Sequence, residues 1–462
     1  MKLKYFLLPG LLALGLSSCG EGFFEQYPSN NITEGNFYKT DDDFNQGVVS
    51  CYAKLKTQMS FHLTEIGYRG DENVLESMAV STQNRYDIDH FAETANNGIL
   101  SDIWNAWYNG IYRCNDVLDH MAGAKIANYD KYRGECLFMR SWWYFNLYRV
   151  FGVVPVTRTV VAPAAAKLIP RCTEEEMYTL LTEDLAEAAR LLPSTPGAEK
   201  ARVANIAAYT LLAKVYLTFG KPAEAKTVLE EAMKNTAYGL ESTTKKAFDV
   251  GNKMNKEIIF ALYYNKTNDN GHGYWYSANT DVMADIRNPT PEFKAIYDSE
   301  KDNRLPLIST YTKIKDNLFA MTKWYDTYDA TYTTQVGNDF PHLRYADVVL
   351  MYAEALAESG GSLGDALTWL NKTRTRAGLD ELTTDEVKSL AEFRSELAAE
   401  RGREFALEGH RWFDLVRLGL AVDYFRGLGY SLDSHNLIFP IPQDQIEIVN
   451  NPSILWQNPG FN

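Results

Sequence analysis

Two stretches of the chain each carry a pair of short amphipathic helices, and this pattern constrains the fold more than any other feature. Residues 201–219 have apolar and small side chains at spacings of three and four. Gly220 and Pro222 end that stripe before a second one that runs to residue 234, and residues 345–377 repeat the arrangement around Gly360 and Gly361. Helix pairs of about 34 residues with small residues at the crossing are typical of tetratricopeptide repeats.

These units predict a mainly α-helical fold built as a helical-repeat scaffold. Degenerate relatives of the pair lie near residues 104–120 and 132–149, and residues 41–56 carry the same helical stripe. One pair cannot bury its apolar face alone, so several units must stack. We therefore expect the repeats to form a frame that supports another part of the chain.

Residues 238–335 differ in composition from the repeats and are rich in Asn, Asp, Gly, Thr and Tyr. They contain short β-like pieces such as residues 257–262 (EIIFAL) and few helical stripes. Long loops held by a rigid frame are where binding residues tend to lie. The sequence predicts a loop-rich, short-stranded ligand-binding insertion at about 238–335, within a single domain that spans residues 37–462.

The first residues predict export and a lipid anchor. Lys2 and Lys4 precede an apolar stretch, residues 5–16, that is too short to span a bilayer, and residues 16–19 (LSSC) form a lipobox. Cleavage there would leave Cys19 as the acylated first residue. We expect a signal peptide at residues 1–18 and a lipidated tether at 19–36, and Gly20 after the cysteine permits delivery to the outer membrane.

Composition argues against one ligand class and favours another. The formal net charge is −14 and no basic stripe occurs, which argues against nucleic acid because phosphate binding needs clustered Lys and Arg. Aromatic residues make up 13% of the chain, with 29 Tyr and 9 Trp. Their flat faces and polar tips suit a ligand such as a sugar, although extra aromatic residues in a helical core explain part of the surplus.

The remaining cysteines give no metal site. Cys51, Cys114, Cys136 and Cys172 form no CxxC pair and have no histidine at metal-ligand spacing. In an exported protein they can pair as disulfides or stay as buried thiols, and the sequence leaves both open. No metal and no other cofactor is predicted.

The C-terminal third carries the most recognisable residues. Residues 400–417 (ERGREFALEGHRWFDLVR), 436–442 (NLIFPIP) and 457–461 (QNPGF) closely resemble the signature helix and the C-terminal ending of the SusD/RagB family of outer-membrane nutrient-binding lipoproteins. Residues 140–145 (RSWWYF) and 151–155 (FGVVP) resemble its central helix and the following loop. The chain departs from the family at Gly402, where a second arginine is common, and at Phe461, where tyrosine is.

The resemblance implies a helical fold with tetratricopeptide units, held at the cell surface by its lipid. Members of this family act as lids over a SusC-like TonB-dependent transporter and hand it glycans or, in some relatives, peptides. It implies that this chain captures an oligosaccharide or polysaccharide for such a transporter in the outer membrane. The alternatives are a peptide-capturing homologue, a structural scaffold lipoprotein and a lipid-anchored glycosidase.

The acidic residues near the signature do not predict catalysis. Glu400, Glu404 and Glu408 recur at four-residue spacing near His410, but Ala406 stands four residues before that histidine, so no HExxH zinc motif exists. A glycosidase needs two carboxylates across a cleft, and no local motif singles out a pair. We therefore predict that the protein is not an enzyme.

Three arginines interleave with these glutamates and explain them better. Arg401, Arg403 and Arg411 are the expected ion-pair partners of the glutamates. Bidentate arginine–carboxylate pairs of this kind would fix the packing of the helix.

Aromatic and amide residues in 263–277 are the first candidate ligand contacts. Three consecutive aromatic residues flanked by glycines cannot all point into a core, which predicts an exposed loop. Rings stack on the C–H faces of sugars and amides bond their hydroxyls, while packing of a ring onto the scaffold is the alternative for each. The candidates are Tyr263, Asn270, Tyr274, Trp275 and Tyr276.

The polar stretch 68–73, with residues 84–86, is the second candidate, because it matches a region of the family that commonly helps to form the ligand site. Asp71 and Asn73 would bond sugar hydroxyls, Arg69 would stack on a sugar or bind an acidic one, and Tyr86 follows nearby. Capping of the next helix is the alternative for Asp71. Trp324 is expected to pack inward and is not a candidate.

Overall fold

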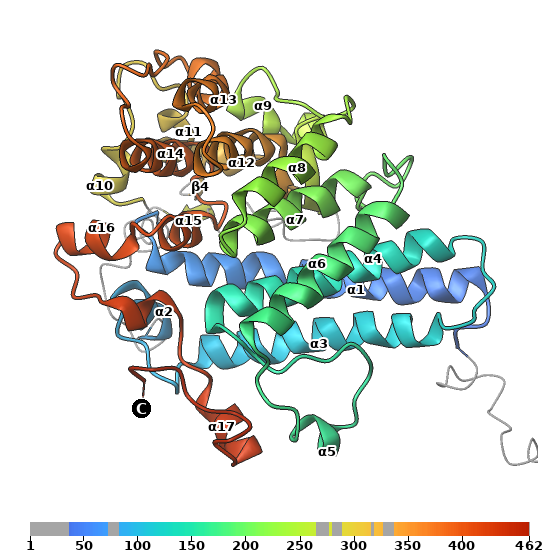
Figure 1. Cartoon of the computed structure of the whole chain (residues 1–462). Coiled ribbons are helices and arrows are strands. Elements are labelled where there is room, and N and C mark those ends of the chain that lie inside the picture. The colour runs from blue at the N-terminus through green and yellow to red at the C-terminus, as the bar shows by residue number, and fades with distance from the viewer. Residues whose placement is uncertain are drawn as a thin grey trace, which may run out of the picture.

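The computed structural model describes residues 37–72, 83–264, 277–279, 289–315, 318–326 and 337–461. Helices dominate these residues and the strands are short (Figure 1). This confirms the predicted mainly α-helical fold class. Within the described ranges, no helix has both the length and the apolar character needed to cross a bilayer. The predicted anchor at Cys19 lies outside the described residues.

The long helices pack one against the next in an array that is continuous in space. Each helix contacts its neighbours in the order α1, α3, α4, α6, α7, α8, α12, α13 and α14. Their bounds are Asp41–Ile66, Gly98–His120, Tyr129–Phe151, Glu174–Leu191, Asn205–Thr218, Pro222–Met233, Tyr345–Glu358, Leu363–Arg376 and Leu390–Glu404. The array is interrupted in the sequence, since α8 packs on α12 although residues 234–344 lie between them.

Both predicted helix pairs are confirmed, as are the helices expected near residues 41–56, 104–120 and 132–149. Gly220, with φ 66°, and Gly360, with φ 82°, adopt the left-handed conformation between the two helices of each pair, which glycine reaches without steric cost. Pro222 then occupies the first turn of α8, where its missing N–H is not needed. Local chemistry thus sets where these helices turn back on one another.

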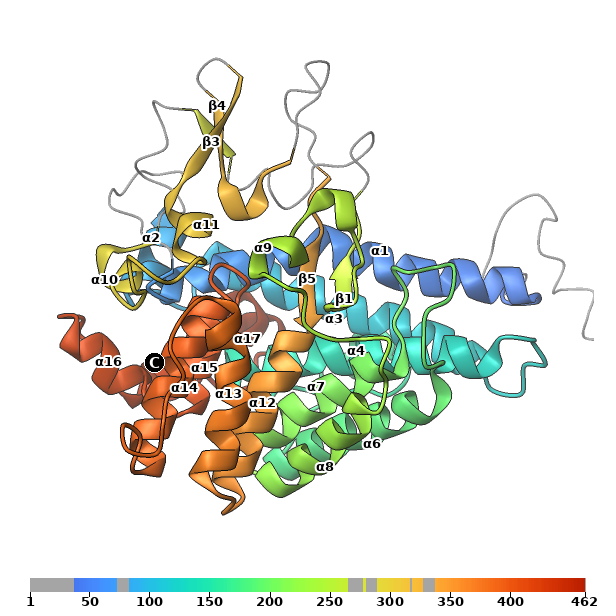
Figure 2. The same ribbon diagram turned by 90° about the horizontal axis from the view of Figure 1, so that it is seen from above.

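The insertion between α8 and α12 contains the strands of the described residues and several single-turn helices, and its last strand, β5, lies beyond the predicted end of the short-stranded region at about residue 335. Antiparallel β1 and β5 form one sheet, and β2, β4 and β3 form another in that order. Figure 2 shows β3 and β4 standing out from the helical array. The bounds are α9 Thr244–Ala247, η4 Val250–Asn252, β1 Ile258–Leu262, β2 Ser277–Asn279, α10 Pro291–Lys294, α11 Leu305–Ser309, β3 Tyr311–Lys315, β4 Leu318–Met321, η6 Thr322–Trp324 and β5 Phe340–Arg344.

The sheet of β1 and β5 is seated on α4. Every residue of both strands is buried. The Phe260 ring lies 5.2 Å from that of Phe138 and 5.8 Å from that of Trp142, and His342 lies 5.0 Å from Trp142 between ring centroids. This aromatic packing fixes the end of β1 against the scaffold.

The segment that resembles one signature helix is two helices with a turn between them, so the expectation of a single helix at 400–417 is wrong. Helix α14 ends at Glu404 and α15 (Arg411–Arg417) begins seven residues later. Leu407, with φ 64°, and Gly409, with φ 75°, are both left-handed and cannot continue a right-handed helix. The remaining short helices are η2 Gly67–Arg69, α2 Gln83–Asp89, α5 Pro163–Ala166, α16 Ala421–Gly427, η7 Ser434–Leu437 and α17 Gln443–Val449.

The C-terminal motifs bind the end of α4. The Phe439 N–H donates to the Val150 carbonyl at 2.8 Å, and the Asn458 amide donates to the carbonyls of Phe151 and Phe439 at 2.9 and 2.7 Å. Arg171 donates to the Asn458 side chain at 2.7 Å. Residues 436–442 and 457–461 therefore satisfy the carbonyls that the end of a helix leaves unpaired.

The four cysteines of the described residues are all buried and free of disulfides. The sequence left open whether these cysteines form disulfides or stay as buried thiols, and in the structure they are buried thiols. Cys51, Cys114 and Cys136 lie on α1, α3 and α4, where they pack as small apolar side chains in the core.

Candidate functional site

The end of β1 places one tyrosine outward and the next inward. Tyr264 is buried: its hydroxyl donates to the Lys56 carbonyl at 3.2 Å and its backbone N–H donates to Asp339 Oδ1 at 2.9 Å. Successive side chains of an extended chain point to opposite faces, so Tyr263 faces out. Its side chain is 45% exposed. The structure thus places this predicted candidate at the surface.

A groove of about 690 Å³ lies beside Tyr263. It is bounded by α1, by residues 198–202 and by the end of β1. Val49, which is 48% exposed, lies on the α1 side, and Tyr52 and Met254 line the walls. The size suits a small ligand or one unit of a longer one.

Two lysines that line this groove lie against the rings of Tyr263 and Tyr264. Lys253 donates to the Tyr264 carbonyl at 2.7 Å and to Asp339 Oδ1 at 2.8 Å, and its ammonium lies 4.4 Å from the Tyr263 ring centroid. Lys56 lies 4.9 Å from the Tyr264 ring centroid. Burial raises the pKa of Asp339, and Lys253 opposes that shift by its charge. A cation over a ring face is attractive, so Lys253 orients Tyr263.

Tyr86 lies on α2, at a different place along the scaffold. Its ring stacks on His90 with a centroid distance of 3.8 Å and an angle of 17° between planes. Helix α2 packs on η2, which follows the end of α1 at Ile66, whereas Tyr264 contacts α1 at Lys56. Ten residues of helix span about 15 Å. The structure therefore does not bring Tyr86 and Tyr263 into one contact surface.

Five of the predicted ligand contacts and the predicted lipidation site lie outside the described residues. They are Asn73, Asn270, Tyr274, Trp275, Tyr276 and Cys19.

The prediction that Arg69 contacts the ligand is wrong for this structure, because its side chain is fully buried. Its guanidinium pairs with Glu93 and donates to the Asn436 carbonyl. It also lies 3.6 Å from the Phe439 ring centroid. Arg69 joins η2 to the C-terminal segment inside the fold.

Asp71 is likewise placed inside the fold, which corrects its prediction as a sugar contact. Arg411 donates to both of its carboxylate oxygens at 3.0 and 3.3 Å, and the Tyr424 hydroxyl donates to Oδ2. The aspartate is 4% exposed. A carboxylate held bidentately by arginine has little capacity left for a ligand.

The glutamates of α14 and the turn after it are structural, as predicted, but most of their partners differ from those expected. Arg304 bonds Glu400 at 2.7 Å and Glu404 at 3.0 Å, and Arg344 bonds Glu404 at 2.6 Å and Glu408 at 2.8 Å. These arginines come from the insertion and from β5. The pairs therefore tie the insertion to the helical array.

Of the three interleaved arginines, only Arg403 pairs with one of these glutamates, Glu400 at 3.0 Å. Arg401 pairs with Asp347 and Asp414, and Arg411 with Asp71. The expectation for Arg401 and Arg411 was wrong because side chains one residue apart on a helix, or across the turn at 405–410, point in different directions.

Trp324 packs inward as expected and is 1% exposed, although it lies in the single turn η6 rather than in a strand. Among the described residues, no group of three or more His, Cys, Asp or Glu side chains is arranged to hold a metal ion.

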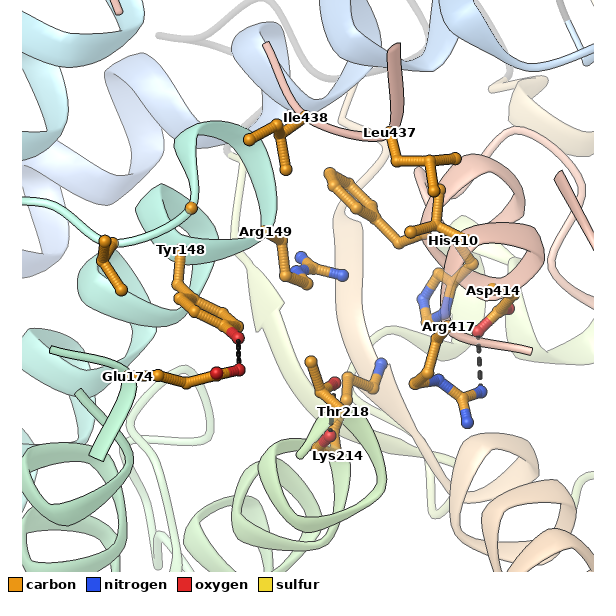
Figure 3. Close-up of a pocket in the computed structure, with 14 residues that line it drawn as sticks. Tyr148, Arg149, Glu174, Lys214, Thr218, His410, Asp414, Arg417, Leu437 and Ile438 are labelled. Atoms are coloured by element: carbon orange, nitrogen blue, oxygen red, sulfur yellow. Dashed lines mark hydrogen bonds and ion pairs between the residues drawn. The ribbon is translucent and has the colours of Figure 1, made fainter. Parts of the chain in front are cut away.

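A second cavity, of about 460 Å³, lies where the ends of α4 and α7 meet α15 (Figure 3). Tyr148, Arg149 and Lys214 line it together with residues near 437. Sequence reasoning missed this cavity, because its lining comes from separate segments that no local motif links.

Two family models match the chain. A model of the SusD family matches residues 303–461, and a model described as starch-binding and associating with the outer membrane matches residues 28–217. The first takes in α12–α15 and the second α1–α7, so the matches cover both parts of the helical array. The chain belongs to the SusD/RagB family.

Several relatives and solved structures match over nearly their whole length. SusD-like protein P2 of Formosa agariphila is 26% identical over 511 residues, which cover 99% of this chain and 100% of the relative. The structure of a SusD superfamily protein from Bacteroides vulgatus has a TM-score of 0.76 at 24% identity, over 92% of this chain and 100% of the other. Surface glycan-binding protein A from Bacteroides thetaiotaomicron, solved with laminarihexaose, has a TM-score of 0.74 at 21% identity, over 91% of this chain and 99% of the other.

These matches confirm the family assignment and the fold that the sequence motifs indicated. Within the SusD/RagB chain described here, the conspicuous charges of the signature segment are buried, and the described surface candidates are Tyr263 with its groove and Tyr86.

Proposed function

We propose that this protein is a cell-surface lipoprotein of the outer membrane that captures oligosaccharides without catalysis. It delivers them to a SusC-like TonB-dependent transporter. The observation that carries the proposal is the likeness over nearly the full chain to a surface glycan-binding protein that was solved with laminarihexaose. The family model described as starch-binding and associating with the outer membrane supports the same class of ligand and the same location.

Within the described residues, the groove beside Tyr263 is the part of the molecule that we propose as the ligand site. Tyr263 offers a half-exposed ring whose orientation Lys253 holds, and such a ring stacks on the C–H face of a sugar. The next residues of the sequence include the other candidates, Asn270, Tyr274, Trp275 and Tyr276. Tyr86 remains a candidate at a separate place on the scaffold, and Asn73, outside the described residues, remains a candidate by its sequence.

The first experiment is a binding screen of the purified protein against a panel of polysaccharides and peptides by isothermal titration calorimetry. Tyr263→Ala and Trp275→Ala are the test variants. Tyr112→Ala is the matched control, because Tyr112 on α3 is also 45% exposed and does not line the groove. We expect one polysaccharide to bind and both test variants to weaken it at least tenfold, with the control unchanged.

Other outcomes of the screen would replace the proposal. A peptide that binds in place of every polysaccharide would favour a peptide-capturing homologue. No binding across the panel would favour a structural scaffold. Release of reducing ends from a bound polysaccharide would favour a glycosidase.

The anchor is tested separately from the ligand. Cys19→Ala is expected to abolish incorporation of labelled palmitate and to release the protein from the membrane fraction.

Residues 37–462 are proposed to form a single domain, because α8 packs directly on α12 across the insertion. One cooperative unfolding transition is expected for it.

A further inference from the structure

The cavity of about 460 Å³ between α4, α7 and α15 has walls of two kinds. Phe413, Val416 and Ile438 give it an apolar side. Arg149 and Lys214 give it a cationic side, and Figure 3 shows both basic groups pointing into the same space. Its volume is that of a site for a small molecule.

Arg149 is the unusual member of this lining, because its guanidinium is only partly bonded. One terminal nitrogen, Nη2, donates to the Asn146 side chain. Nε is buried without a hydrogen-bond partner, and among the described residues no carboxylate lies within 4.0 Å of the group. The guanidinium lies 3.9 Å from the Phe413 ring centroid and 4.7 Å from that of Phe145. The rings fix its plane and leave its N–H edge for another acceptor.

The other basic groups named for this lining each have a carboxylate in direct contact. Lys214 pairs with Asp347 at 2.5 Å, and Arg417 pairs with Glu354 and, at 3.1 Å, with Asp414. The remaining acid of the lining, Glu174, is exposed and accepts a hydrogen bond from the Tyr148 hydroxyl at 2.7 Å. Arg149 is therefore a basic group of the lining with no carboxylate in direct contact, and the charges of Asp414 and Asp347 act on it only from farther away.

The burial of Arg149 without a carboxylate in contact is costly. Burial lowers the pKa of Arg149 to about 9, so the group remains protonated at neutral pH. A buried donor of this guanidinium that has no acceptor, such as Nε, has lost its contact with water without gaining a hydrogen bond. An anion in the cavity would supply the missing acceptor and place a negative charge in contact with Arg149.

We propose that this cavity binds a small organic acid whose carboxylate pairs with Arg149 and whose body rests on the apolar wall. A planar carboxylate matches the fork of a guanidinium. One cation without a carboxylate in contact, in a lining that also holds Asp414 and Glu174, favours a monoanion over a phosphate dianion, which those acids would repel more strongly. The site is separate from the groove beside Tyr263 and shares no lining residue with it.

The test uses isothermal titration calorimetry of the purified protein with acetate, benzoate and D-glucuronate as carboxylate probes. Inorganic phosphate and chloride are the comparison anions. At least one carboxylate is expected to bind saturably in 150 mM sodium chloride, and Arg149→Gln is expected to weaken it at least tenfold. Arg158→Gln is the matched control, since Arg158 is an exposed arginine that pairs with Glu183 at the surface.

A second variant keeps the arginine and removes the space. Thr218 lines the cavity on α7, so Thr218→Trp is expected to fill it and to abolish binding while the thermal unfolding midpoint stays near that of the wild type. Circular dichroism shows whether each variant is folded. If Arg149→Gln does not fold, Thr218→Trp decides the question alone.

Three results would overturn the proposal. The first is that no carboxylate binds saturably. The second is that Arg149→Gln and Thr218→Trp bind the carboxylate as tightly as the wild type. The third is that phosphate or chloride binds more tightly than all three carboxylates. None of them bears on the glycan proposal, because that proposal depends on the groove beside Tyr263.

Discussion

The packing around α14 and the groove beside Tyr263 place residues where their chemistry alone would not predict them. Around α14, Arg304, Arg344 and Glu404 are nearly or fully buried, although charged side chains usually lie at the surface. Beside the groove, Tyr263 is half-exposed while the adjacent Tyr264 is buried. The comparison shows that interaction partners decide whether a side chain is buried. A charged side chain can be buried where oppositely charged side chains pair with it.

The two regions should therefore respond to substitution in opposite ways. Removing a member of the buried network strands a charge and costs stability, whereas removing an exposed ring costs little stability and acts on binding. The following changes would break or sharpen that contrast.

Glu404→Gln is expected to cause the largest loss of stability. Glu404 meets Arg304, Arg344 and Arg376, and its loss removes the carboxylate that all three share, which leaves the buried network one negative charge short. Breaking a buried pair of this kind costs about 3–5 kcal/mol. Urea unfolding followed by circular dichroism measures it, with Glu231→Gln at an exposed pair as a control expected to change stability by less than about 0.5 kcal/mol. Equal effects of the two variants would contradict the contrast.

Arg69→Met is expected to cost about 3 kcal/mol, because it strands Glu93 in the interior. Arg69→Met combined with Glu93→Gln is expected to cost less than the single change, since both charges are gone. Chemical denaturation of the single and double variants tests this. Binding of the identified glycan should be unchanged in the double variant, and a specific loss of affinity there would restore Arg69 as a ligand contact.

Glu72 is expected to make the protein less stable as the pH rises from 5 to 8. Burial, reinforced by the charge of Asp71, raises its pKa to about 8, so the folded state holds a proton that the unfolded state releases above its ordinary pKa near 4.5. The stability that this bound proton contributes is fully present below about pH 4.5. It is lost progressively as the pH rises to about 8. Glu72→Gln should flatten the profile by about 3 kcal/mol over this range.

Thermal unfolding of wild type and Glu72→Gln at pH 5, 6, 7 and 8 measures this difference. Glu135, whose pKa burial raises to about 7, contributes in the same direction in both proteins and does not affect the comparison. Parallel profiles for the two proteins would show that Glu72 is not the group responsible.

Tyr263→Ala is expected to have the smallest effect on stability, within about 0.5 kcal/mol, because half of its ring already faces solvent. Its effect on the identified glycan should be at least tenfold in affinity, or about 1.4 kcal/mol. Differential scanning calorimetry and binding of the same sample separate the two. A large loss of stability with unchanged affinity would make Tyr263 a packing residue.

Much of the scaffold could be predicted because its signals are local. Helical stripes and the turn residues Gly220, Pro222 and Gly360 identified α7, α8, α12 and α13 to within a few residues. The strand at 257–262 was also predicted, since a short apolar run rich in β-branched residues has few other solutions. The break in 400–417 was missed because Leu407 gives no sign in the sequence of its left-handed backbone.

The candidate site was harder to predict. Tyr263 reaches the surface as expected, but Arg69 and Asp71, which read as polar loop residues, lie inside. Their partners Glu93 and Arg411 are far away in the sequence, in the case of Arg411 by 340 positions. No local sequence pattern can indicate an ion-pair partner that lies so far away along the chain.

The sequence by itself determined the helical-repeat scaffold, the loop-rich insertion and the family to which the chain belongs. Each of these follows from spacings and motifs that act over a few residues, where propensity and turn chemistry decide. Only the tertiary structure decided which charges are buried, how the array continues from α8 to α12, and that Arg149 faces a cavity without an acidic partner among the described residues. These depend on contacts between distant segments, whose energies exist only once the chain has brought them together.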